Sequence, residues 1–299
     1  MRTRLPKFHP KELARRVCRR ASLDLSESFA QPSLFVKQQV RQALAHRARL
    51  IDLGGSGERI NLFIHGYKSL ETEAQVERTS RRIRALAIPG HNYLLQWSSG
   101  KWRDSALAGA LTASYRVARF RHLLAPWMVL VDAGVLTISE VAQFKWMEQR
   151  ARFVGRDLES LVDSIDGARG RPINLIGHSL GARVIHHALA AGSWRDHTLQ
   201  DGVMLGGAAD LDSPDWLDCV AKLHGQLFNG HSKKDRILAI APDFRRRVGS
   251  APLPFVEIGG KAKVVNHHCQ GIRHVEYWTR LERVLPVVWS RCYSAAIVR

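Results

Sequence analysis

The chain has 299 residues, 45% of them hydrophobic, which suits one large mixed domain with a sizeable core and leaves little room for two. Lysine and arginine number 45 against 27 acidic residues, so the net charge of +18 should attract anionic partners unless the basic side chains are simply solvated. The four cysteines are widely spaced and form no C-x-x-C pair, which argues against a disulfide framework or a zinc site and fits a reducing compartment.

Residues 1–58 are predicted to form a basic, mainly helical N-terminal arm. The first twenty residues are rich in arginine and lysine, and they lack the apolar core that a secretory signal requires. Apolar residues then recur at helical spacing until the run Gly54–Gly57 interrupts the pattern. We therefore expect a cytoplasmic protein whose main domain covers residues 59–299.

From residue 59 the pattern changes to short apolar runs that alternate with longer helical stretches, as in a parallel sheet with crossover helices on both faces. Strands are predicted at Arg59–Ile64, Tyr93–Trp97, Ile173–Ile176, Val203–Leu205, Gln226–Phe228 and Lys263–Val265. Helices are predicted at Glu73–Leu86, Glu148–Ile165, Ala182–Ala191, Pro214–Leu223 and His274–Val287. The sequence thus predicts an α/β class.

The second and third predicted strands are separated by about seventy residues, more than a simple crossover needs. We predict a helical insertion at about residues 103–147. Within it, Leu123–Ile138 is apolar apart from Asp132, but it is shorter than the roughly 20 residues of a membrane span. It is interpreted either as a helical hairpin buried against the sheet or as a lid or membrane-facing cap over an active site.

The clearest functional signal is the sequence Gly177-His178-Ser179-Leu180-Gly181, which follows an apolar strand and precedes a helix. A serine in G-x-S-x-G at such a strand-to-helix turn projects its hydroxyl above the sheet as a nucleophile. Gly177 and Gly181 lack the Cβ atoms that would obstruct the approach of strand and helix. The motif alone arises by chance, so an inert serine in a surface turn is the alternative to Ser179 as nucleophile.

Upstream, the predicted strand at residues 59–64 ends in His65-Gly66-Tyr67. In this architecture a backbone N–H of that loop acts together with the N–H of the residue after the nucleophile. We therefore predict the Tyr67 and Leu180 N–H groups as donors to an oxyanion. His65, Gly66 and the rest of the G-x-S-x-G turn would support them, although an ordinary strand-ending turn would have the same sequence.

The acid and the base should follow the nucleophile in that chain order. Asp235 is favoured as the acid because it follows a predicted strand after a short polar loop, and His274 is favoured as the base because it occupies a loop beyond the last strand. Spacing alone leaves alternatives open for both roles. These are Asp210 or Asp212 for the acid and His267 or His268 for the base.

Three phrases in this order, Arg171–Ile185, Leu227–Leu238 and Gly271–Tyr277, resemble a poorly characterised α/β-hydrolase family. Its eukaryotic members are transmembrane-and-coiled-coil-domain proteins, and smaller bacterial relatives exist. The resemblance covers about residues 59 to 285. It implies an α/β-hydrolase fold, Ser179, Asp235 and His274 as the triad, and lipid-ester or related acyl chemistry. We expect no transmembrane segment in this chain, so membrane anchoring does not carry over.

Together these features predict a serine esterase or lipase-like hydrolase that cleaves a carboxylic ester through an acyl-enzyme. Neither a metal nor an organic cofactor is expected, because the histidines lack the spacing of metal ligands. Peripheral contact with an anionic membrane is predicted from the charge, whereas nucleic acid is not, since no nucleic-acid-binding motif is present. The alternative is a non-catalytic binding protein of the same fold at an anionic membrane or nucleic-acid surface.

Overall fold

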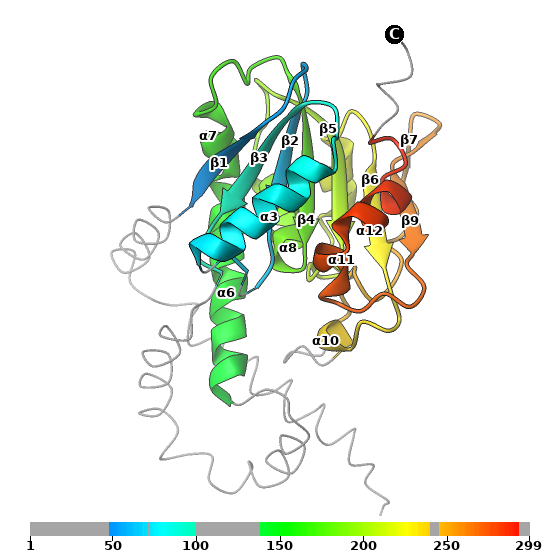
Figure 1. The fold of residues 1–299 in the computed structure, drawn as a ribbon. Helices are drawn as coiled ribbons and strands as arrows, with labels where there is room; N and C mark the ends of the chain where they lie inside the picture. Colours follow the sequence, from blue (N-terminus) through cyan, green and yellow to red (C-terminus); the bar gives the residue numbers. More distant parts are fainter. Residues whose placement is uncertain (1–47, 68, 71, 100–137, 240–244, 293–299) are drawn as a thin grey trace, which may run out of the picture.

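The computed structural model describes residues 48–67, 69–70, 72–99, 138–239 and 245–292. They form a mostly parallel sheet of seven strands covered by helices on both faces (Figure 1). This arrangement confirms the predicted α/β-hydrolase fold class. None of the helices in these ranges is long and apolar enough to cross a membrane. The predicted apolar stretch at residues 123–138 lies almost wholly outside them.

The order of the strands across the sheet shows which strands lie at its centre. It runs β1 (Arg49–Gly54), β3 (His91–Gln96), β2 (Ile60–Ile64), β4 (Pro172–His178), β5 (Thr198–Leu205), β6 (Leu227–His231) and β9 (Val264–His268). Only the pairing of β1 with β3 is antiparallel among these neighbours. From β2 the chain turns first to one side, to β3, and later to the other, to β4. In open α/β sheets the ligand site lies beyond the carboxyl ends of the strands at such a switch point.

Each face of the sheet carries its own apolar core, because successive side chains of a strand point to opposite faces. Leu62 packs in the core beneath α6 (Ile138–Arg156) and α8 (Leu180–Ala191), whereas its neighbour Phe63 packs in the core beneath α3 (Glu73–Ala85) and α12 (Leu281–Val288). All five residues of β2 are buried, as expected for a central parallel strand.

Several elements differ from the predictions. Residues 49–54 were predicted as part of the helical arm 1–58 but form strand β1, so the sheet begins before residue 59. Residues 1–47 of the arm lie outside the described residues. The predicted helix at 148–165 starts ten residues earlier as α6 and is interrupted at Asp157, after which α7 (Leu158–Asp163) follows. Of the predicted insertion at about residues 103–147, residues 103–137 lie outside the described ranges.

Near the C-terminal end, the predicted helix at 274–287 is two short helices, α11 (Glu276–Thr279) and α12. His274 therefore lies in a loop before a helix rather than in one. The predicted helix at 214–223 is shorter, as α9 (Trp216–Ala221). Three short elements carry too few residues for a periodic pattern and were not predicted: α10 (Arg236–Ala239), β7 (Glu257–Ile258) and β8 (Lys261–Ala262).

Candidate active site

Strand β4 passes directly into helix α8 through Ser179, whose backbone has φ 54° and ψ −119°. A residue other than glycine in such a conformation costs about 1–3 kcal/mol, so its surroundings must hold it. Both backbone groups of Ser179 are bound to the end of β5: its N–H donates to the Leu205 carbonyl (3.1 Å), and its carbonyl accepts from the Ala208 N–H (2.9 Å). The strained turn is therefore fixed from the neighbouring strand.

The two glycines of the motif are required by the space around them. A Cβ on Gly177 would lie 2.7 Å from the Gly181 carbonyl carbon, and one on Gly181 would overlap the Ile64 carbonyl oxygen. Neither contact leaves room for a methyl group, because both partners are backbone atoms. The G-x-S-x-G spacing thus lets helix α8 cross closely over the ends of β4 and β2.

The three side chains predicted as a triad form one hydrogen-bonded row. His274 Nε2 lies 2.8 Å from Ser179 Oγ, and His274 Nδ1 lies 2.7 Å from Asp235 Oδ2. Since a carboxylate only accepts, Nδ1 carries the hydrogen and Nε2 of the neutral ring accepts from the serine hydroxyl. The buried Asp235 is also held by the Leu238 N–H, which donates to its Oδ1 (3.2 Å).

Each member of this row follows a different strand at the same end of the sheet. Ser179 follows β4, Asp235 follows β6 and His274 follows β9. The residues kept as alternatives are engaged elsewhere. Asp210 belongs to a buried ionic cluster, Asp212 is an exposed partner of an arginine, and His267 and His268 end the edge strand β9.

The loop after β2 packs directly on the serine. A Cβ on Gly66 would lie 2.6 Å from the Ser179 Cβ. The fully buried ring of His65 bonds through Nδ1 to the Gly66 carbonyl (2.9 Å), while its Nε2 accepts the Trp97 N–H (3.3 Å). In a planar trans peptide the C=O and the N–H point in opposite directions. By holding the Gly66 carbonyl, His65 therefore sets the direction of the Tyr67 N–H.

The Leu180 N–H is oriented in a similar way. It shares a peptide plane with the Ser179 carbonyl, which accepts the Ala208 N–H. Leu180 is the first residue of helix α8, and the first N–H groups of a helix have no partner within it. Both predicted oxyanion donors thus belong to peptides whose carbonyl ends are anchored, one by a histidine ring and one by the β5 loop.

Two further histidines of the site are held neutral. Burial lowers the pKa of His65 from 6.5 to about 4, against two backbone hydrogen bonds that raise it. Burial, aided by the positive charge that His274 can carry, lowers the pKa of His178 to about 3. At neutral pH both rings are therefore uncharged and serve as hydrogen-bonding groups of fixed direction.

A buried ionic cluster lies behind the loop that anchors Ser179. Glu148 on α6 pairs with Arg247 (2.8 Å) and Arg183 (3.0 Å), and both arginines also pair with Asp210. The Arg247 side chain is fully buried, and Arg183 donates to the Ala208 carbonyl (3.1 Å). The cluster thus ties α6 and α8 to the β5 loop. The sequence analysis missed this cluster, because its members come from three segments that are far apart in the chain.

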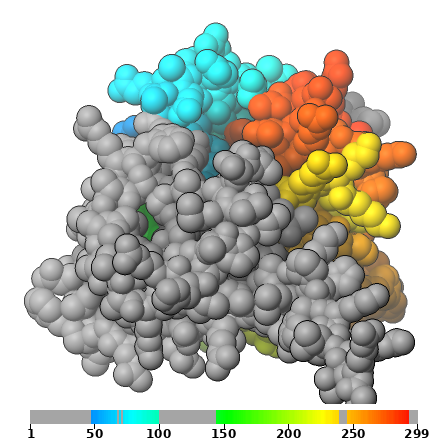
Figure 2. Space-filling view, turned by 90° about the horizontal axis from the view of Figure 1, so that it is seen from below, coloured from blue at the N-terminus to red at the C-terminus, as the bar shows by residue number. Residues whose placement is uncertain are grey.

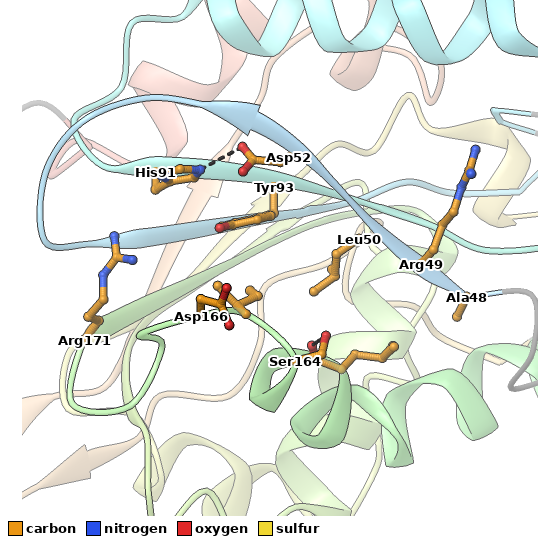
Figure 3. A pocket seen from close by; sticks show the side chains of 11 residues that line it. Ala48, Arg49, Leu50, Asp52, His91, Tyr93, Ser164, Asp166 and Arg171 are labelled. Atoms are coloured by element: carbon orange, nitrogen blue, oxygen red, sulfur yellow. Dashed lines mark hydrogen bonds and ion pairs between the residues drawn. The ribbon is translucent and has the colours of Figure 1, made fainter.

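A surface cavity of about 610 Å³ lies along β1 and β3, at one edge of the sheet. It is bordered by the start of β1 and by the turn before β4. Asp52 on β1 and His91 on β3 pair at 2.7 Å in its lining, which also includes Arg171 (Figure 3). None of Ser179, Asp235 and His274 lines this cavity, so it is separate from their hydrogen-bonded row. In the part of the chain that the structure describes, no three His, Cys, Asp or Glu side chains form a group able to hold a metal ion.

Comparisons with known proteins give one uncharacterized relative and several distantly similar solved structures. An uncharacterized membrane protein of Caenorhabditis elegans, F35D11.3, is 28% identical over 197 residues, which are 62% of this chain but only 29% of the length of that relative. A predicted CIB-like hydrolase from Thermoplasma acidophilum is 14% identical and covers 80% of this chain and 90% of its own, with a TM-score of 0.38. A Pyrobaculum calidifontis esterase is 14% identical over 99% of this chain and 96% of its own, with a TM-score of 0.36.

Residues 123–289 match the model of a family described as "Protein of unknown function (DUF726)". The match includes the serine turn, the loop of Asp235 and the loop of His274, whereas the His65–Tyr67 loop lies before it. Because the match spans more than half of the 299 residues, the chain belongs to the DUF726 family.

Proposed function

We propose that this protein is a serine hydrolase that cleaves a carboxylic ester, with Ser179 as nucleophile, His274 as general base and acid, and Asp235 as the group that orients His274. The observation that carries the proposal is the hydrogen-bonded row from Asp235 through His274 to Ser179, at 2.7 and 2.8 Å. A serine hydroxyl is a weak nucleophile alone, and a base oriented by a carboxylate is the arrangement that activates it.

In the proposed reaction, Ser179 Oγ attacks the ester carbonyl carbon while His274 Nε2 takes the hydroxyl proton. The tetrahedral intermediate then expels the alcohol, which receives that proton from His274. Water, deprotonated by His274, attacks the acyl-enzyme, and the second tetrahedral intermediate releases the acid as His274 returns the proton to Ser179 Oγ. Asp235 keeps the imidazole in the tautomer with hydrogen on Nδ1 and stabilises the imidazolium that forms twice in the cycle.

The Tyr67 and Leu180 N–H groups are the proposed donors to the oxyanion of each intermediate. Their support comes from the contact of Gly66 with Ser179 and from the anchored carbonyls of the two peptides. Donors that are fixed before the reaction need no reorganisation as charge develops, and each is typically worth about 2.7–4 kcal/mol in the transition state.

The proposed substrate is an acyl ester, and the proposed location of the reaction is an anionic lipid surface. The loops of Asp235 and His274 expose four cationic side chains without ion-pair partners in the described residues: Lys233, Lys234, Arg236 and Arg273. Beside them lie Ile237 (50% exposed) and Val275 (59% exposed). The segments that follow β6 and β9 reach the surface at this end of the molecule (Figure 2, yellow to orange). Cationic and apolar groups together suit an anionic membrane interface, where each lysine or arginine contributes about 1 kcal/mol.

Ester hydrolysis tests the reaction. We expect the wild type to hydrolyse members of a series of p-nitrophenyl esters of increasing acyl length, and Ser179→Ala and His274→Ala to lose that activity while keeping the wild-type circular dichroism spectrum. Full hydrolysis by Ser179→Ala would refute the mechanism. A folded wild type inactive on every ester, with and without anionic vesicles, would instead favour a fold used only for binding.

Vesicle flotation tests whether this surface binds an anionic membrane. We expect binding to phosphatidylserine-containing vesicles that weakens at high salt, and a marked loss of binding in Lys233→Glu/Lys234→Glu. Arg169→Glu/Arg195→Glu is the matched control, since these exposed residues precede β4 and β5 at the opposite end of the sheet. Equal loss in both variants would mean that net charge alone drives binding.

A further inference from the structure

The proposed mechanism leaves one buried group of the site without a role, the ring of His178 directly before Ser179. Its Nε2 lies 2.9 Å from the carbonyl oxygen of His274. Because a carbonyl can only accept, Nε2 must carry a hydrogen, and Nδ1 of the neutral ring has none. Nδ1 is buried and has no hydrogen-bond partner among the residues that the structure describes. The ring is therefore committed to a single hydrogen bond, to the backbone of the residue proposed as the base.

The ring also fills the space between the two loops that face Ser179. A Cβ on Gly66 would lie 3.2 Å from His178 Nδ1, so one edge of the ring faces the Gly66 backbone. The opposite edge holds His274, whose own ring lies at a centroid distance of 5.1 Å. One face stacks on Trp278, with centroids 5.6 Å apart and planes at 19°. Contacts on three sides leave the ring little freedom.

We propose that His178 is a positioning residue that fixes the backbone of the His274 loop at the correct distance from Ser179, an inference that rests on the proposed function. The fold explains why the His274 loop needs such a contact. His274 lies in a loop between the edge strand β9 and the short helix α11, without regular structure around it. His178 and Ser179 are consecutive, so a bond from His178 to the His274 backbone closes a small ring that contains the Ser179–His274 hydrogen bond.

His178 does not act as a proton carrier in this role. Its pKa of about 3 keeps it neutral across the pH range in which esterases are assayed, and no donor in the described part of the chain reaches its Nδ1. A positive charge on it would also repel the imidazolium of His274 at the step where that cation forms. A neutral ring fixes the loop without opposing the charge that the reaction creates.

The kinetics of inactivation by a fluorophosphonate distinguish an effect on the position of His274 from an effect on binding of the probe. His178→Phe keeps a flat ring for the Trp278 stack but lacks the N–H, whereas His178→Gln places an N–H near the position of Nε2. We expect His178→Phe to lower the maximal inactivation rate by about 10- to 100-fold with little change in the concentration for half-maximal rate, and His178→Gln to recover much of it. A purely structural defect would lower the fraction of protein labelled instead of the rate.

Two results would overturn the role. The first is a His178→Phe protein that is inactivated at the wild-type rate, which leaves the proposed function intact. The second is seen in the wild type without any substitution: ¹⁵N NMR of the His178 ring should give neutral imidazole with hydrogen on Nε2 from pH 5 to 9, and hydrogen on Nδ1 would contradict the bond to His274. A wild type that never reacts with the probe would refute the proposed function and this role with it.

Discussion

Replacement of Gly66 by alanine tests the packing of the loop after β2 against the nucleophile. The added methyl carbon would lie 2.6 Å from the Ser179 Cβ and 3.0 Å from the His178 carbonyl oxygen, about 0.8 Å short of ordinary contact at 3.4 Å for the closer pair. Neither neighbour can rotate away, because one is a Cβ and the other a backbone atom. The Ser179 backbone is held on both sides by β5, so the loop should move.

A movement of this size displaces the Tyr67 N–H, the proposed oxyanion donor in the same loop. Loss of one such donor lowers kcat by about 10²- to 10³-fold, and misplacement by about 1 Å costs about 10²-fold. We therefore expect Gly66→Ala to lower kcat on a p-nitrophenyl ester by about 10²- to 10³-fold while the protein stays folded.

Gly202→Ala in β5 is the matched control. Its methyl would meet the terminal carbons of Leu227 and Leu223, which belong to flexible side chains far from the serine. We expect a small loss of stability and an unchanged kcat per folded molecule, measured by stopped-flow hydrolysis after active-site titration. Gly66→Ala with wild-type kcat would refute the placement of the loop against Ser179.

Three further changes have defined outcomes. Asp235→Asn should keep the fold and lower kcat by about 10⁴-fold, because the amide favours the wrong tautomer of the base; a drop under tenfold would contradict its role. Glu148→Gln leaves the fully buried Arg247 with one carboxylate fewer and should lower the free energy of unfolding by about 3–5 kcal/mol in urea titrations, whereas a change below 1 kcal/mol would mean that the cluster is dispensable. His65 and His178 have folded pKa values of about 4 and about 3, below the 6.5 of the unfolded chain, so the unfolded state binds more protons between about pH 4 and 6.5. Stability should therefore fall as the pH drops from 7 to 5, by at most about 1.4 kcal/mol per pH unit for each ring, and a flat profile would contradict their burial as neutral groups.

The serine turn was predictable because its requirements are local. A strand must lead into it, a helix must follow, and Gly177 and Gly181 must flank Ser179 at a spacing that the close approach to Ile64 explains. The same local logic identified the His65-Gly66 dipeptide at the end of β2. The choice between Asp235 and Asp210 stayed open in the sequence, because both follow strands; the contact of Asp235 with His274 appears only in the folded chain.

Other features were not predictable because they depend on contacts between distant segments. Strand β1 is a short amphipathic edge strand whose pairing with β3 is invisible in its own residues. The bond of His178 to the His274 carbonyl joins residues 96 positions apart. The arginine partners of Glu148 come from α8 and from the segment after residue 244, and no periodicity in α6 points to them. Such networks are set by tertiary packing.

Labelling with a fluorophosphonate, followed by mass spectrometry of the modified peptide, tests the central claim most directly. We expect one probe molecule per chain, bound to Ser179, with no labelling of Ser179→Ala and greatly slowed labelling of His274→Ala. A probe attached to another serine, or a rate unaffected by His274→Ala, would contradict the assignment of an activated nucleophile to the row of Ser179, His274 and Asp235.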